Sequence, residues 1–567
     1  MSALDDLADR YVDEFAALDP CVATIIGVAG QESRLTDYSP DGFAARAELA
    51  GRTLTALNAT PAESDTDRIG AAVLRERLEV ELELAAAGIP DADLNPFSGP
   101  LLCLWYAITL LNQGAETRWE AVCDGVRALP GTLAGLRQSV ARARQDGRVA
   151  ARRQIDLSAR QAEQFTEILT GLSAQYSARN GDGPLRARLD EAVRAANAAL
   201  TDFGRFLAEN LAPSAPDRDA LGRDRYALGA RDSLGTRLDL EETYAWGWEE
   251  LARIETEMRA TAARLMPGES VPAVLAALNA DPAHRVTGAD AFRGWIQELA
   301  DRTIAELDGV RFDIPDGLRR IDCRIPETGG GIYYAPPTED LSRPGTMWWS
   351  LPDPAADVIT WGAPAVMFHE GAPGHHLQLG STVLNTSGLN RFQRFSCVLH
   401  QGHSEGWGLY AERLMAELGH YADPAHLMGM LAGGQQVRAA RVILDIGLHL
   451  ELPIPRGTGF HEGERWTREL GVEFLRDHCG PGNESSVAFE IDRYLCWPAQ
   501  AIAYKVGERV WMEAREAVRR RQGAAFDLKA FHKQALDLGP MGLDLLRTEL
   551  TRDLADGPGI LEARPEH

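Results

Sequence analysis

The segment HEGAPGHH, which starts at His369, holds three histidines and one glutamate in a chain with only 13 histidines. In the motif HExxH on a helix, two histidines one turn apart bind zinc and the glutamate between them acts on water. His369 and Glu370 match the start of that motif, but four residues then separate them from His375 and His376. The residue types indicate metal-assisted hydrolysis, whereas the spacing requires a departure from a regular helix.

A regular helix would keep these histidines apart. At a rise of 1.5 Å per residue, His369 and His376 lie about 10 Å apart along the axis, which two nitrogens about 2 Å from one metal cannot span. Pro373 lacks an N–H and its ring clashes with the carbonyl of His369, while Gly374 permits a sharp excursion. If about two residues bulge out before Gly374, His375 takes the place of the second histidine of HExxH. The alternative is a helix that Pro-Gly ends, with histidines at its edge.

A third ligand is expected from the downstream segment HSEGWGLYAERLMAEL. A catalytic zinc held by two histidines commonly takes a carboxylate as well and leaves one position for water. Glu405 and Glu412 are seven residues apart and share a helix face. Gly402, Gly406 and Gly408 leave room around Glu405 for another helix to approach. We therefore favour Glu405 as the ligand and expect Glu412 to face solvent.

Four motifs follow one another in the order VMFHEGAPGHHLQ, HSEGWGLYAE, RAARVILDIGLH and YLCWPAQAIAYKVGE, with GIYYAPP ahead of them. Through these motifs the chain resembles domain-of-unknown-function family 885, whose pattern is roughly HExxPGH, EGWxLYxE, RxxxDxGxH and PxQAxxYKxG. Those bacterial proteins resemble zinc peptidases of the HExxH-plus-Glu kind, such as thimet oligopeptidase and angiotensin-converting enzyme. The resemblance covers most of the chain. It implies a mainly α, metallopeptidase-like fold, with a small β element beside the active-site helix and a cleft between two helical halves.

The resemblance also implies roles for individual residues. His369, His375 and Glu405 would bind a Zn²⁺ ion. Glu370 would be the general base, taking a proton from the zinc-activated water and passing it to the leaving nitrogen. His376 lies outside the shared pattern, so we expect it beside the site or facing the substrate, with a role as metal ligand only as a fallback.

Two tyrosines are candidates to stabilise the oxyanion that forms during hydrolysis. Tyr504 is the first choice, because similar peptidases use a tyrosine from a C-terminal helix, and Tyr494 is its rival. Either could instead be a buried tyrosine whose hydroxyl has a local partner. Lys505 could bind a substrate carboxylate, although a single lysine on a helix is usually solvated.

Arg441, Asp445 and His449 recur every four residues and so share one helix face. In one interpretation a carboxylate here orients a ligand histidine by accepting its other N–H. In the other, a buried Arg–Asp pair joins two helices. His403, two residues before Glu405, is a further candidate to face the cleft.

Amphipathic helices must position these residues. Apolar residues recur at helical intervals from about residue 3 to 210, and a break rich in Pro, Gly and Asp follows at 212–233. We expect an N-terminal helical region (1–211) and a catalytic region (234–567), with one continuous fold as the alternative. In the catalytic region, residues 310–360 predict a small β element and 361–555 predict the metal-binding helices.

The segments GIYYAP and TMWWSL within the β element are predicted to be strands of a small sheet. Zinc peptidases commonly bind an extended substrate backbone along an edge strand, so Tyr333 and Tyr334 could line the cleft. The alternative is that both aromatic rings pack against the core, as aromatic residues in strands often do.

The composition limits the partners and the location. With 83 Asp and Glu against 58 Lys and Arg, the net charge is −25, and no block of basic residues interrupts the sequence. Nucleic acid and membrane are therefore not expected as partners. An acidic start and seven scattered cysteines without a CxxC pair predict a cytoplasmic protein.

The sequence thus predicts a zinc-dependent hydrolase whose substrate is a peptide or a small amide. A zinc hydrolase of non-peptide amides would use the same residues, and a catalytically silent binding protein could retain the same fold. Glu370 argues against the silent protein, because a structural zinc site needs no free carboxylate beside its ligands.

Overall fold

The computed structural model of the protein describes residues 2–112, 118–181, 183–326, 331–479 and 484–552. Helices dominate this part of the chain, which confirms the prediction of a mainly α fold. Residues 327–330 of the predicted β element, and the last three residues of the helical region predicted to end at 555, lie outside the described residues.

Two compact units make up the chain. The first comprises Met1–Leu221 with Leu495–Trp497, and the second comprises Gly222–Tyr494 with Pro498–His567. The boundary falls inside the segment expected to be a linker, but the second half of that segment forms helix α9 (Arg223–Leu234) of the second unit. The predicted cleft between two helical halves stays a prediction.

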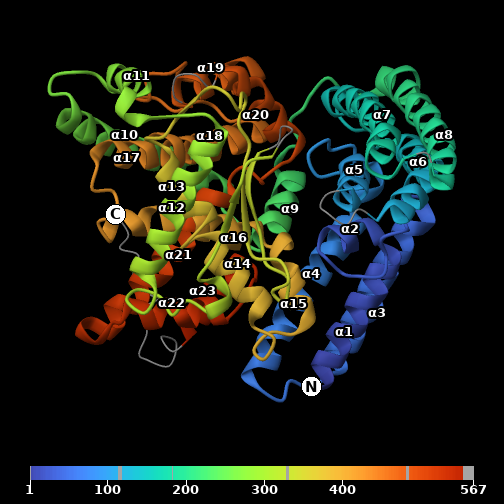
Figure 1. Ribbon diagram of the computed structural model, residues 1–567, viewed down its shortest axis with the longest axis horizontal. Coiled ribbons are helices and arrows are strands. Elements are labelled where there is room, and N and C mark those ends of the chain that lie inside the picture. Colours follow the sequence, from blue (N-terminus) through green and yellow to red (C-terminus); the bar gives the residue numbers. More distant parts are fainter. Residues whose placement is uncertain (1, 113–117, 182, 327–330, 480–483, 553–567) are drawn as a thin grey trace. The chain divides into compact units, whose positions relative to one another are not determined.

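The first unit is helical. Its α-helices are α1 (Ala3–Leu18), α2 (Pro20–Ile25), α3 (Pro40–Ala59), α4 (Asp65–Ala86), α5 (Pro100–Leu111), α6 (Trp119–Gln145), α7 (Arg152–Asn180) and α8 (Pro184–Phe206). Helices α6, α7 and α8 lie side by side (Figure 1) and bury apolar faces that include Leu133, Phe165 and Leu200. The helical periodicity of the sequence therefore reflects one shared core.

The second unit holds all the candidate site residues. Its remaining α-helices are α10 (Leu240–Leu265), α11 (Val271–Ala280), α12 (Ala289–Leu307), α13 (Ala363–Glu370), α14 (His375–Leu384), α15 (Arg391–Phe395), α16 (Gln401–Glu417), α17 (Pro424–Gly429), α18 (Val437–Leu450), α19 (Arg468–His478), α20 (Glu484–Cys496), α21 (Ala503–Gln522), α22 (Leu528–Asp537) and α23 (Leu543–Leu550). A π-helical segment, η7 (Met430–Gln436), leads into α18.

Two small sheets accompany these helices. Strands β2 (Asp322–Arg324), β4 (Thr346–Trp349) and β3 (Ile332–Ala335) form one sheet in that order, with β2 parallel and β3 antiparallel to β4. Strands β1 (Arg285–Thr287) and β5 (Asp357–Ile359) form an antiparallel pair. The segments predicted as strands, GIYYAP and TMWWSL, are β3 and β4, and β3 contacts α14.

Glycines bring α16 against α21. A Cβ atom on Gly507 of α21 would lie 2.1 Å from the carbonyl oxygen of Gly402 and 2.6 Å from the Cα of Gly406. Side chains cannot be accommodated at such distances, so the two backbones touch directly. This contact lets Glu405 on α16 and Tyr504 on α21 serve the same site.

Candidate metal centre

Three residues bring potential ligand atoms together. His369 at the end of α13, His375 at the start of α14 and Glu405 on α16 each offer an atom, and these atoms lie within 4.8 Å of one another. Glu405 Oε2 is 3.3 Å from His369 Nε2 and 3.5 Å from His375 Nε2. Ligand atoms of a tetrahedral zinc site are about 3–3.5 Å apart when the bonds are about 2 Å long. The arrangement therefore fits a zinc ion.

The chain reaches this geometry by a different route from the predicted bulge. Helix α13 ends at Glu370 and a new helix, α14, begins at His375, so the two histidines lie on two helices. The Ala372–Pro373 peptide is cis, and the Pro373 carbonyl accepts a hydrogen bond of 2.8 Å from Trp407 Nε1. A Cβ on Gly374 would lie 1.9 Å from the His369 carbonyl oxygen, so only glycine fits there. The His369 and His375 rings are 4.7 Å apart.

The carboxylate of Glu412 contacts Nδ1 of His369, the ring nitrogen that does not contact Glu405. This contact corrects the expectation that Glu412 faces solvent. Glu412 is 2% exposed, and its Oε1 lies 2.9 Å from His369 Nδ1. Gly434 provides the space, since a Cβ there would lie 2.1 Å from Glu412 Oε2. Such a contact orients an imidazole so that its other nitrogen points to the metal. The clue in the sequence was the seven-residue spacing from Glu405.

Three carboxylates, those of Glu405, Glu412 and Glu370, act on the His369 ring. Burial alone would lower its pKa, but Glu405 and Glu412 outweigh burial and raise the pKa of His369 to about 10. Burial likewise favours a neutral Glu405, but hydrogen bonds from His369 and His375 lower the pKa of Glu405 below its ordinary value. The site therefore concentrates negative charge around two imidazoles, as a cation site requires.

His376 lies outside the ligand cluster although it adjoins His375 in sequence. Its Nδ1 is 3.0 Å from the Tyr334 hydroxyl and its Nε2 is 2.8 Å from the Leu318 carbonyl oxygen. Both ring nitrogens are thus engaged, one by Tyr334 of β3 and the other by the Leu318 backbone. Burial lowers the pKa of His376 to about 4.

Glu370 lies beside the cluster without belonging to it. It is half-buried, and burial raises its pKa while the neighbouring His375 and His369 lower it. The charge of Arg438 acts on it as well. Glu370 is thus a carboxylate close to the candidate ligands that is not one of them.

Tyr504 and Tyr494 differ in what their hydroxyls do. The half-buried Tyr504 ring stacks on the His369 ring at 6.3 Å, and its hydroxyl has no hydrogen-bond partner within the described part of the chain. The buried Tyr494 hydroxyl donates to Glu490 at 2.7 Å and accepts from Arg441 at 3.0 Å. Of the two candidates, Tyr504 therefore has the hydroxyl that is available to a substrate.

The trio on α18 does not orient a ligand histidine. Arg441 pairs with Glu490 at 2.9 Å, whereas Asp445 accepts from the Tyr226 hydroxyl and the Ala499 N–H, both at 2.7 Å. Neither sequence interpretation holds, because Arg441 and Asp445 have different partners. Burial raises the pKa of Asp445 to about 7, so this carboxyl group is a weaker acid than an ordinary aspartate.

The two remaining candidate histidines, His449 and His403, also lie in the interior. His449 contacts the Tyr494 carbonyl oxygen through Nε2 at 3.0 Å, and burial lowers its pKa to about 4. His403 is buried, with Nδ1 3.0 Å from Gln378 Nε2, and burial lowers its pKa to about 3. Both are held as neutral imidazoles away from the ligand cluster.

Lys505 is buried rather than solvated. Its ammonium group lies 2.8 Å from Glu250 and 2.5 Å from both Glu508 and Gln435. A lysine with these partners joins α21 to α10 and η7, so it is not free to bind a substrate carboxylate.

The two tyrosines of β3 face opposite ways, as alternation along a strand requires. Tyr334 is buried against His376, whereas Tyr333 is 46% exposed and stacks on Trp348. Within the described residues β3 pairs only with β4, so it is an edge strand of its sheet. Strand β3 contacts α14. Substrate binding along this edge strand stays a prediction.

The chain matches one protein family over most of its length. The family described as "Bacterial protein of unknown function (DUF885)" matches residues 20–550. The chain belongs to this family. No curated protein matches it.

Two solved structures share the fold. A "putative lipoprotein" from Colwellia psychrerythraea has 20% identity and a TM-score of 0.79, over 98% of this chain and 100% of the other. A "putative lipoprotein of unknown function" from Shewanella oneidensis has 16% identity and a TM-score of 0.75, over 97% and 99% of the two chains.

These descriptions overturn the predicted cytoplasmic location, since both neighbours of the DUF885 chain are described as lipoproteins. The prediction was wrong because it rested on the charge of the first residues and on the spacing of the cysteines, and neither property determines the compartment of a protein. Among the described residues no helix is long and apolar enough to cross a membrane.

Proposed function

We propose that this DUF885 protein is a zinc-dependent hydrolase that cleaves peptide bonds. The observation that carries the proposal is the convergence of His369, His375 and Glu405 from three helices, with atoms 3.3 and 3.5 Å apart. Glu370 beside them and the available hydroxyl of Tyr504 supply the other two groups that amide hydrolysis needs.

The proposed metal is zinc because the donor set is two imidazoles and one carboxylate, which leaves a position open. A zinc ion held there would supply Lewis acidity, polarising the substrate carbonyl and lowering the pKa of water. The buried Glu412 supports the assignment, because it turns the Nε2 atom of His369 towards Glu405.

The side chains then divide the work of hydrolysis. Glu370 accepts a proton from the water whose oxygen bonds to the carbonyl carbon. Tyr504 donates a hydrogen bond to the oxyanion that develops on the carbonyl oxygen. When the carbon–nitrogen bond breaks, Glu370 delivers its proton to the nitrogen, so that one acid and one amine leave.

The substitution Glu370→Gln tests this proposal. It keeps the shape of the side chain but removes the base, so we expect zinc content to be retained and kcat to fall by about 10²–10⁴-fold. Metal content is measured by mass spectrometry of the dialysed protein, and hydrolysis is followed on a mixed peptide library. Glu464→Gln is the matched control, because Glu464 is 61% exposed and pairs with His461 on the surface.

The outcomes separate the proposal from its competitors. Hydrolysis of simple acylated amines with peptides left intact would replace the peptidase by an amide hydrolase. Zinc binding without hydrolysis of either class by the unsubstituted protein would indicate a silent binding protein. A protein that takes up no zinc would end the proposal.

A further inference from the structure

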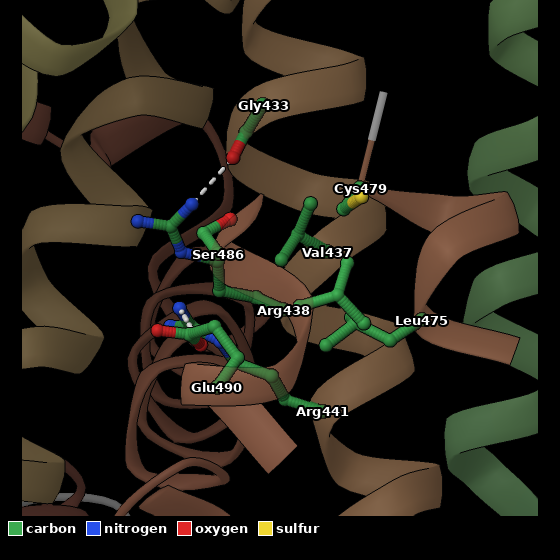
Figure 2. A pocket seen from close by; sticks show the side chains of 9 residues that line it. Gly433, Val437, Arg438, Arg441, Leu475, Cys479, Ser486 and Glu490 are labelled. Carbon is green, nitrogen blue, oxygen red and sulfur yellow. Dashed lines mark hydrogen bonds and ion pairs between the residues drawn. The ribbon is translucent and has the colours of Figure 1, made fainter. Parts of the chain in front are cut away.

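A small pocket lies next to the candidate metal centre. It is lined by residues of η7, α18, α19 and α20, among them Arg438, Arg441, Ser486 and Glu490 (Figure 2), and has a volume of about 200 Å³. Pockets for drug-sized ligands are commonly ~300–1,000 Å³. This pocket therefore has room for one small polar group or one end of a chain.

The two arginines in this pocket differ in their partners. Arg441 donates to Glu490 at 2.9 Å and to the Tyr494 hydroxyl at 3.0 Å, and Glu490 also pairs with Arg493. The Glu490 carboxylate thus already has two arginine partners within the protein. Burial would raise its pKa, but Arg441 and Arg493 outweigh burial and hold the pKa of Glu490 below its ordinary value.

Arg438 forms no ion pair within the described residues, although its charge also acts on the carboxyl group of Glu370. It donates to the carbonyl oxygen of Gly433, a neutral group (Figure 2), and its buried Nε atom has no hydrogen-bond partner there. A guanidinium presents its donors in a planar fork that matches a carboxylate. The pocket therefore contains a positive charge and a donor without an acceptor, which favours an anion.

One aromatic ring separates this charge from the ligand cluster. The guanidinium carbons of Arg438 and Arg441 lie 5.4 and 5.2 Å from the Tyr504 ring centroid. The same Tyr504 ring stacks on His369. In a peptide, neighbouring Cα atoms are about 3.8 Å apart. Arg438 and His369 both lie against this one ring, so an anion held by Arg438 lies a few residues from a carbonyl group held at the cluster.

We propose that this pocket binds a carboxylate of the substrate through Arg438, and that the carboxylate is the free carboxyl terminus of a peptide. This inference rests on the proposed peptidase function. The enzyme then cleaves close to the carboxyl end, because Arg438 and His369 of the ligand cluster contact the same Tyr504 ring. The sequence analysis considered Lys505 for binding a substrate carboxylate. We assign that role to Arg438, since Lys505 already pairs with Glu250 and Glu508.

The test uses a pair of peptides that share one sequence and differ only in a free or amidated carboxyl terminus. The zinc-loaded protein should cleave the free acid with a kcat/KM about 10- to 100-fold higher, the value of a charge-assisted hydrogen bond. Arg438→Ala should abolish this preference, mainly by raising KM for the free acid, so that the two peptides are then cleaved with the same kcat/KM. Arg438→Lys should restore part of the preference, since it keeps the charge but not the fork.

Controls show whether the variants are intact. Zinc content and thermal unfolding are measured for both Arg438 variants, and Arg259→Ala serves as the matched control, because Arg259 is 61% exposed on α10. A third peptide, amidated and ending in glutamate, separates the two sources of a carboxylate. Cleavage of that peptide at the free-acid rate, dependent on Arg438, would assign the pocket to a side chain and overturn the terminal assignment.

The two levels of the proposal fail differently. Equal cleavage of the free acid and the amide, with no effect of Arg438→Ala, would overturn the carboxylate pocket and leave the peptidase standing. If the zinc-loaded protein cleaves neither peptide, nor any member of the library, the peptidase proposal fails and the pocket assignment fails with it.

Discussion

Among the described residues of the second unit, two groups of histidines and a carboxylate could hold a metal, and the two groups differ in their surroundings. His369, His375 and Glu405 lie in the interior, where the two histidines are 5% and 7% exposed. His284, Asp423 and His426 are all half-buried, with ring centroids of the two histidines 6.1 Å apart. By residue type alone, the two clusters are equivalent.

The difference lies in what supports the ligands. In the interior cluster, Glu412 contacts Nδ1 of His369 and the Tyr504 ring stacks on the His369 ring. The carboxyl group of Glu370 lies close to both histidines. In the half-buried cluster, Asp423 uses one oxygen to cap α17, through the Ala425 N–H. Neither His284 nor His426 has a hydrogen-bond partner for its ring within the described residues. A ligand set becomes a reactive site only when other groups orient it and supply a base.

The largest expected effect comes from breaking the interior cluster at its second histidine. His375→Ala should remove zinc and lower activity by more than the ~100-fold that loss of an orienting partner costs. His376→Ala is the matched control: it should keep the zinc, although it leaves the Tyr334 hydroxyl and the Leu318 carbonyl without their partner, at about 1–3 kcal/mol for each. Metal analysis and thermal unfolding check both variants. Zinc lost from His376→Ala but kept by His375→Ala would refute the ligand assignment.

A smaller effect is expected when the interior cluster is made to resemble the half-buried one. Glu412→Gln removes the charge behind His369, so zinc affinity should fall about 10–100-fold. The affinity is measured by competition with a chelating dye. Glu417→Gln is the control on the same helix, because Glu417 is 42% exposed and pairs with Arg515. Equal zinc affinity in both variants would mean that Glu412 does not orient the ligand.

The smallest effect is expected at the half-buried cluster. Its imidazoles have no orienting partner, so any zinc bound there should be weaker and should be lost on dialysis, leaving one ion per chain. The double substitution His284→Ala with His426→Ala should remove that weak equivalent from a zinc titration and leave hydrolysis unchanged. Two ions retained after dialysis would show that local support matters less than this comparison implies.

Local patterns in the sequence predicted several features well. The helical periodicity and the two strands depend on neighbours in the chain, and the close approach of another helix at Gly402 and Gly406 depends on the absence of side chains there. The candidates His369, His375 and Glu405 came from residue types and motif order. The structure brings potential ligand atoms of these three residues together, and their role as metal ligands stays a prediction.

Long-range contacts explain the features that the sequence did not reveal. Glu412 looked solvent-facing by composition, but its partner His369 lies 43 residues away. Arg441 and Asp445 share a helix face, yet their acceptor and donors come from α20, α9 and the residues before α21. No spacing rule on one helix reports which other helix arrives against it.

The sequence by itself determined a mainly helical chain, its family motifs and a set of residues suited to zinc, because these depend on residue type and local spacing. Only the tertiary structure decided that the HEGAPGHH segment is divided between two helices, that His376 turns to β3, and that Arg438 and not Lys505 lacks a counter-ion among the described residues. The physical reason is that each of these outcomes depends on which buried groups meet across helices, and a buried charge is either paired by a neighbour or left for a ligand.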